Sequence, residues 1–143
     1  MPVEQELQLL DRYVEIQRAR FGDRLTVDVV IDEDATKRAL VPSLLLQPLV
    51  ENSIKHGIGA RAGAGRIEIA ISRSGDTLAI EIRDDGRGLG DAEVKDGLGL
   101  GNCRSRLQTL YGTANHRLEM LNRDTGGAIV RIALPFQIER AGS

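Results

Sequence analysis

Residues 66–88 read RIEIAISRSGDTLAIEIRDDGRG, and this stretch decides the fold. Its segments 67–71 and 78–82 both alternate isoleucine or leucine with polar or small residues, which is the pattern of a strand with one buried face. The sequence Ser-Gly-Asp at 74–76 separates the two segments and is typical of a tight turn. The stretch therefore predicts a β-hairpin.

The flanking sequence adds helices and further strands at both sides of this hairpin. Apolar spacing predicts helices over 4–20, 42–56 and 103–111, and strands over 25–31, 117–121 and 128–134. Pro42 begins the second helix in this interpretation, and Gly57 caps its end. Pro48 then falls inside that helix, so a kink or two short helices joined there are expected.

The order of these elements indicates an α+β fold class. The simplest way to bury their apolar faces is a two-layer α/β sandwich, with helices on one face of a mixed, mostly antiparallel sheet. The 143 residues are 41% hydrophobic and 28% charged, which fits one globular domain. Residues 139–143 are expected to be a loose tail.

Composition argues against several classes of protein. A net charge of −2 and the absence of tryptophan give no electrostatic case for nucleic-acid binding. Cys103 is the single cysteine, so an internal disulfide is excluded, and two histidines add no plausible metal cluster. No apolar run approaches the roughly 20 residues that cross a bilayer, so a cytoplasmic segment without membrane contact is expected.

Three segments carry the residues that suggest chemistry. A carboxylate before Gly-x-Gly, as in Asp84 to Gly88, offers a fixed acceptor beside backbone that a flat ring such as adenine can approach. The glycine run 97–101 precedes a predicted helix, whose first N–H groups attract phosphate. On the second helix, Asn52 offers an oxygen to Mg²⁺, and Lys55 lies on nearly the same face to balance phosphate charge.

Each segment alone has a plain structural interpretation. An Asp-x-Gly-x-Gly is usually a turn, and the run 97–101 could be a flexible loop, because it lacks the preceding strand of a Rossmann fingerprint and the Gly-Lys-Ser/Thr ending of a P-loop. Glu51, Asn52 and Lys55 could be the solvated face of an amphipathic helix. The order and spacing of all three segments favour a nucleotide site.

That order resembles the GHKL superfamily of ATPases, which gyrase, heat-shock chaperones, MutL and histidine kinases share. Within it the chain is most similar to the LytS-type sensor kinases. The similar residues are spread over nearly the whole chain, at 13–17, 20–25, 42–57, 99–102, 106–107 and 111–112.

The resemblance implies a role for each site residue. Asp84 accepts from the adenine amino group, Asn52 ligates Mg²⁺ and can take part in catalysis, Lys55 contacts phosphate, and Glu51 polarises a water or the incoming nucleophile. The glycines and the amide that shape the pocket or the base of a lid over ATP are Gly86, Gly88, Gly97, Gly99, Gly101 and Asn102. Pro48 departs from the family, because many histidine kinases have a further asparagine there, so the phosphate contacts are expected to differ.

The resemblance also implies an arrangement of domains and partners. Residues 1–22 form a connector helix from a missing phosphoacceptor domain, and 23–138 form the ATP-binding catalytic domain. The phosphoacceptor histidine lies on that separate domain, through which the full-length kinase forms a homodimer. The full-length kinase is expected to be membrane-anchored, and its response regulator is an indirect partner of this chain. His56 and His116 are not in a phosphoacceptor motif, so the fragment is expected to bind Mg-ATP without phosphorylating itself.

Two alternatives stay open on sequence grounds. One is a non-catalytic module that senses nucleotide and transfers nothing. The other is a free-standing GHKL serine kinase of the anti-sigma-factor type, which is about this length; the LytS-like residues at 13–25 speak against it.

Overall fold

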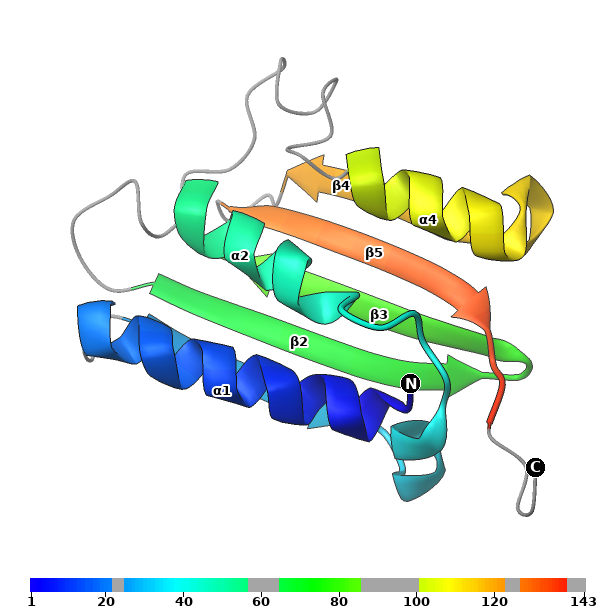
Figure 1. Cartoon of the computed structure of the whole chain (residues 1–143), viewed down its shortest axis with the longest axis horizontal. Helices are drawn as coiled ribbons and strands as arrows, with labels where there is room; N and C mark the ends of the chain where they lie inside the picture. The colour runs from blue at the N-terminus through cyan, green and yellow to red at the C-terminus, as the bar shows by residue number, and fades with distance from the viewer. Residues whose placement is uncertain (22–24, 57–64, 86–100, 123–126, 139–143) are drawn as a thin grey trace.

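The computed structural model describes residues 1–21, 25–56, 65–85, 101–122 and 127–138 (Figure 1). The helices and strands in chain order are α1 (Val3–Phe21), β1 (Leu25–Ile31), α2 (Leu46–His56), β2 (Gly65–Ser74), β3 (Thr77–Asp84), α4 (Gly101–Tyr111), β4 (Arg117–Asn122) and β5 (Ala128–Pro135), with short 3-10 turns η2 (Asp34–Arg38) and η5 (Thr113–Asn115). None of the helices within the described ranges is long and apolar enough to span a bilayer.

The strands form one mixed sheet in the order β1-β2-β3-β5-β4. The edge strand β1 pairs with β2 in parallel, and all other neighbours are antiparallel. Figure 1 shows α1, α2 and α4 side by side on one face of this sheet. The predicted two-layer α+β architecture, mostly antiparallel with helices on one face, is therefore confirmed.

The hairpin that the sequence predicts lies at the centre of the sheet. The buried face of β2 consists of Ile67, Ile69 and Ile71, and that of β3 includes Ile80 and Ile82. Because side chains alternate along a strand, the residues between these buried ones project onto the helix-free face. Gly75 makes the connecting turn with φ +60°, a conformation that glycine adopts without strain.

The helix α1 belongs to the same hydrophobic core as the sheet. Its residues Val3, Leu10 and Val14 are buried there. Ile16 fits the apolar spacing by which the sequence predicts this helix, yet it is 67% exposed, and the charged Glu6 is buried at 2% exposure. Whether residues 1–22 act as a connector stays a prediction.

The second helix begins later than predicted. It begins at Leu46, because Leu44 has φ +56°, a left-handed conformation that a helix does not continue through. Pro48 is therefore the third residue of α2, inside the first turn, where the missing N–H costs no helical hydrogen bond. The expected kink at Pro48 is wrong for this reason, and Gly57 lies outside the described residues.

Candidate nucleotide site

Asp84 ends β3 on the face of the sheet that carries the helices. It follows Ile80 and Ile82 in the alternation of that strand, and only 5% of its surface is exposed. A carboxylate is rarely buried to this extent without a partner group. Asp84 thus places a carboxylate in a mostly apolar layer at the end of β3.

The neighbouring carboxylate, Asp85, is occupied by strand pairing. Its Oδ1 accepts a hydrogen bond from the backbone N–H of Arg66 at 2.8 Å, and its own N–H donates to the Arg66 carbonyl at 3.2 Å. These two bonds close the end of the β2–β3 pair. Asp84, by contrast, lies on the same face of β3 as the buried Ile80 and Ile82, which is the face that carries the helices.

Gly127, which is not among the predicted site residues, lies against the backbone of Asp84. It precedes β5 with φ +96°, and a Cβ at this position would overlap the carbonyl oxygen of Asp84 and lie 2.9 Å from Cα of Asp85. Only glycine allows this close approach of two backbones. In the sequence Gly127 follows Gly126, and such a pair indicates a turn but not a close approach to Asp84.

The predicted metal and phosphate residues of α2 lie along its C-terminal half. Glu51 is exposed, Asn52 is half-buried, and Ser53 and Ile54 are buried against the core. Asn52 therefore sits at the margin between the packed and the solvated sides of the helix. Lys55 belongs to the last turn of α2, and this helix contacts β3.

The third predicted segment leads into α4 as expected. This helix begins at Gly101, followed by Asn102, so the end of the glycine run coincides with free N–H groups of a first turn. Gly86, Gly88, Gly97 and Gly99 lie outside the described residues. In Figure 1 the end of α2, the end of β3 and the start of α4 lie at the same end of the sheet.

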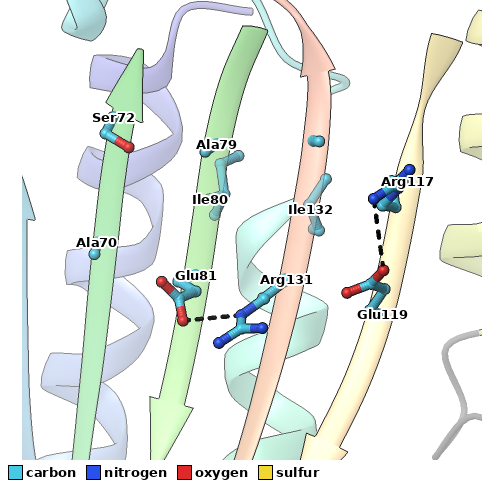
Figure 2. Close-up of a pocket in the computed structure, with 10 residues that line it drawn as sticks. Ala70, Ser72, Ala79, Ile80, Glu81, Arg117, Glu119, Arg131 and Ile132 are labelled. Atoms are coloured by element: carbon cyan, nitrogen blue, oxygen red, sulfur yellow. Dashed lines mark hydrogen bonds and ion pairs between the residues drawn. The ribbon is translucent and has the colours of Figure 1, made fainter. Parts of the chain in front are cut away.

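A hollow on the opposite, helix-free face is a different kind of surface. Figure 2 shows Glu81, Arg131, Arg117 and Glu119 around it, next to small residues such as Ala70. Glu81 pairs with Arg131 at 3.2 Å, and Arg117 pairs with Glu119 at 4.0 Å. Because acids and bases neutralise each other there, the hollow has little attraction for a polyphosphate.

The residues present fit a nucleotide with magnesium better than a metal held by protein alone. Within the described ranges, no group of three or more His, Cys, Asp or Glu side chains could hold a metal ion. Mg²⁺ usually keeps several waters and binds through few protein oxygens together with substrate phosphates. A single amide oxygen such as that of Asn52, on a helix that ends at the same end of the sheet as α4 begins, suits that mode of binding.

Comparison with known proteins agrees with the predicted resemblance. Residues 38–138 match the family described as histidine kinase-, DNA gyrase B-, and HSP90-like ATPase. The sensor histidine kinase YpdA of Escherichia coli K12 is 38% identical over 82% of this chain, which is 22% of that protein. The sensor protein LytS of Enterococcus faecalis is 30% identical over 97% of this chain and 25% of that protein. The chain thus spans about a quarter of the length of these relatives.

Solved structures show the same fold. The catalytic domain of the histidine kinase ThkA superimposes with a TM-score of 0.72 at 14% identity, over 97% of this chain and 96% of that one. The blue-light-activated histidine kinase of Erythrobacter litoralis EL346 gives a TM-score of 0.67 at 25% identity, over 95% of this chain and 42% of that one. The chain belongs to the family of histidine kinase-, DNA gyrase B- and HSP90-like ATPases.

Proposed function

We propose that this chain is the ATP-binding catalytic domain of a sensor histidine kinase, which positions Mg-ATP for transfer of the γ-phosphoryl group to a histidine on a separate dimerisation domain. The supporting observation is the buried carboxylate of Asp84, at the end of the sheet where α2 ends and α4 begins. Phosphoryl transfer asks little of a protein beyond position and charge neutralisation; in this proposal Asp84 positions the adenine, and groups on α2 and α4 balance the phosphate charge.

Each predicted residue has a defined task in this proposal. Asp84 accepts a hydrogen bond from the adenine amino group, and Asn52 supplies an oxygen to Mg²⁺. Lys55 and the first N–H groups of α4 balance phosphate charge. Glu51, exposed on α2, polarises the incoming nucleophile. The glycines between 86 and 101 let the backbone approach the nucleotide closely.

The phosphoacceptor belongs to another part of the kinase in this proposal. His116 is half-buried before β4, and its Nδ1 lies 2.6 Å from the carbonyl oxygen of Gly112, which ties the ring to the turn after α4. The relatives YpdA and LytS are about four times longer than the matched region, which leaves room for such a domain. The proposal includes a homodimeric, membrane-anchored full-length kinase with a cytoplasmic catalytic domain and a response regulator as its downstream partner.

The adenine contact is tested by replacing Asp84 with alanine. The loss of a charge-assisted hydrogen bond should weaken ATP binding roughly 10- to 100-fold in a calorimetric titration. Glu81→Ala is the matched control, because Glu81 lies on the same strand but faces the helix-free side. Equal affinities of Asp84→Ala and wild type would show that adenine binds elsewhere.

A further inference from the structure

The carboxylate of Glu6 joins α1 to the first turn of α2. Its side chain is buried, and Oε2 accepts a hydrogen bond from the N–H of Leu44 at 2.9 Å. Its Oε1 accepts from the N–H groups of Leu45 at 2.6 Å and Leu46 at 3.2 Å. One acid of α1 thereby satisfies three backbone donors around the start of another helix.

This contact takes the place of a local helix cap. The first turn of α2 has no acidic residue of its own, although the N-terminal end of a helix favours negative charge. Leu44 is held with φ +56°, a left-handed conformation that is unfavourable for a residue with a side chain. The three bonds to Glu6 offset that cost and define where α2 begins.

The same short segment is also held from α4. Arg106 donates from Nη2 to the carbonyl oxygen of Ser43 at 2.6 Å. Residues 43–46 therefore connect all three helices that cover the sheet. Two of these helices, α2 and α4, carry residues proposed to contact metal and phosphate.

We propose that Glu6 is a positioning residue for the nucleotide site, acting through α2. This inference rests on the proposed function and names a residue outside the predicted site. Asn52 is six residues beyond Leu46, about 9 Å along the helix axis at about 1.5 Å per residue. A rigid helix transmits the orientation of its first turn over that distance, so the bonds to Glu6 set where the Asn52 oxygen lies.

Hydrophobic packing alone leaves this orientation less well defined. Leu46, Leu49 and Val50 are almost fully buried and hold α2 on the sheet. Burial of apolar surface is non-directional, however, and tolerates small rotations or shifts of a helix. Three hydrogen bonds to one fixed carboxylate are directional, and they select one rotation of α2.

The test compares Glu6→Ala and Glu6→Gln with Val14→Ala. Val14 is a buried residue of the same helix, so its truncation lowers stability while its apolar side chain makes no polar contact with α2. Binding of Mg-ATP and of metal-free ADP is titrated at a temperature where every variant is folded. Amide hydrogen exchange along α2 is measured on the same samples.

Glu6→Ala should weaken Mg-ATP binding about tenfold, as expected when one tenth of the molecules hold the competent geometry. Metal-free ADP binding should weaken less, because ADP without metal depends on Lys55 but not on the Asn52 oxygen. Exchange in α2 should be faster. Glu6→Gln, which keeps one acceptor oxygen, should fall between Glu6→Ala and wild type. Val14→Ala should leave both affinities within about twofold of wild type.

Unchanged Mg-ATP affinity in Glu6→Ala, or an equal loss for Mg-ATP and metal-free ADP, would overturn the positioning role. Failure of the proposed nucleotide site has a different signature, because wild type itself would then bind no Mg-ATP; failure of phosphoryl transfer alone leaves the affinities of this test unchanged. In that case the exchange data still decide the structural step: α2 exchange equal in Glu6→Ala and Val14→Ala overturns it, and faster exchange in Glu6→Ala alone supports it.

Discussion

Asp84 and Asp85 show how one position along a strand separates two roles. The strand alternation places Asp84 with the buried isoleucines of β3, whereas Asp85 bonds to the backbone of Arg66. The alternation is legible in the sequence, so the burial of Asp84 follows from it, whereas the role of Asp84 as adenine acceptor stays a prediction. The contact with Gly127 could not, because it joins residues more than 40 positions apart that sheet pairing brings together.

Gly127→Ala should destabilise the chain strongly. The added Cβ meets the backbone of Asp84 and Asp85, which cannot move without breaking strand pairing, and φ +96° strains any side chain. A loss of about 2 kcal/mol or more in the free energy of unfolding is expected in urea. Gly75→Ala is the control, because its φ is +60° but nothing lies within 4 Å of the new Cβ.

That control should lose only about 1–2 kcal/mol, the cost of the left-handed conformation alone. Equal losses for Gly127→Ala and Gly75→Ala would mean that the close approach to Asp84 is not required. Because Gly127 adjoins the proposed adenine acceptor, its substitution should also weaken ATP binding under conditions where the variant is folded.

At the scale of elements, α2 shows where local signals are insufficient. A proline at position 42 is a good helix start by sequence, yet α2 begins at Leu46. The residue that defines this start, Glu6, is 38 to 40 positions away in the chain. Pro48 then lies in the first turn, so the same proline that predicted a kink fits a straight helix.

Asp32 links β1, η2 and β2, and its protonation should affect stability. Its carboxylate accepts from the backbone N–H of Arg73 at 2.9 Å and from Thr36 Oγ1 at 2.7 Å. These bonds, first the one from Arg73, hold the pKa of Asp32 below its ordinary value of 3.8. A lowered folded-state pKa stabilises the fold above pH 3.8, and this contribution is lost as the pH falls through the folded-state pKa.

Asp32→Asn should therefore lower the urea midpoint at neutral pH, and its difference from wild type should shrink as the pH falls below 3.8. Asp34→Asn provides the control, since the Asp34 side chain is 99% exposed. Its midpoint should follow wild type at every pH. If the urea midpoints of Asp32→Asn and wild type differed by the same amount at every pH, the link between Asp32 protonation and stability would be contradicted.

At the scale of the whole molecule, the sheet divides the chain into two surfaces. One face carries three helices and the proposed site, and the other carries paired charges such as Glu81 with Arg131.

Cys103 is partly buried against the core, and burial raises the pKa of its thiol, so it is a poor nucleophile at neutral pH. The described part of the chain thus suits binding and positioning of a nucleotide.

This chain, incubated alone with labelled Mg-ATP, should acquire no acid-labile phosphohistidine, because a nucleophile in line with the γ-phosphate is expected on another domain. A separately prepared phosphoacceptor domain should become labelled when it is added, and Asn52→Ala should abolish that labelling. His56→Ala and His116→Ala identify any label that does appear on this chain.

Labelling of an anti-anti-sigma protein on serine would instead favour the free-standing serine kinase. Mg-ATP binding without transfer to either partner would favour the nucleotide-sensing module. These outcomes separate the three functions that the sequence left open.

The sequence by itself determined which elements form and the buried faces of the strands, because alternation in strands and helical spacing are local properties. It also determined the family, since the three site segments and their order are written along the chain and residues 38–138 match it. Tertiary structure decided what depends on residues far apart: the order β1-β2-β3-β5-β4, the start of α2 at the Glu6 carboxylate, and the approach of Gly127 to Asp84. Such contacts form only when the chain has folded, because hydrogen bonds and steric limits between distant segments leave no periodic signal in the sequence.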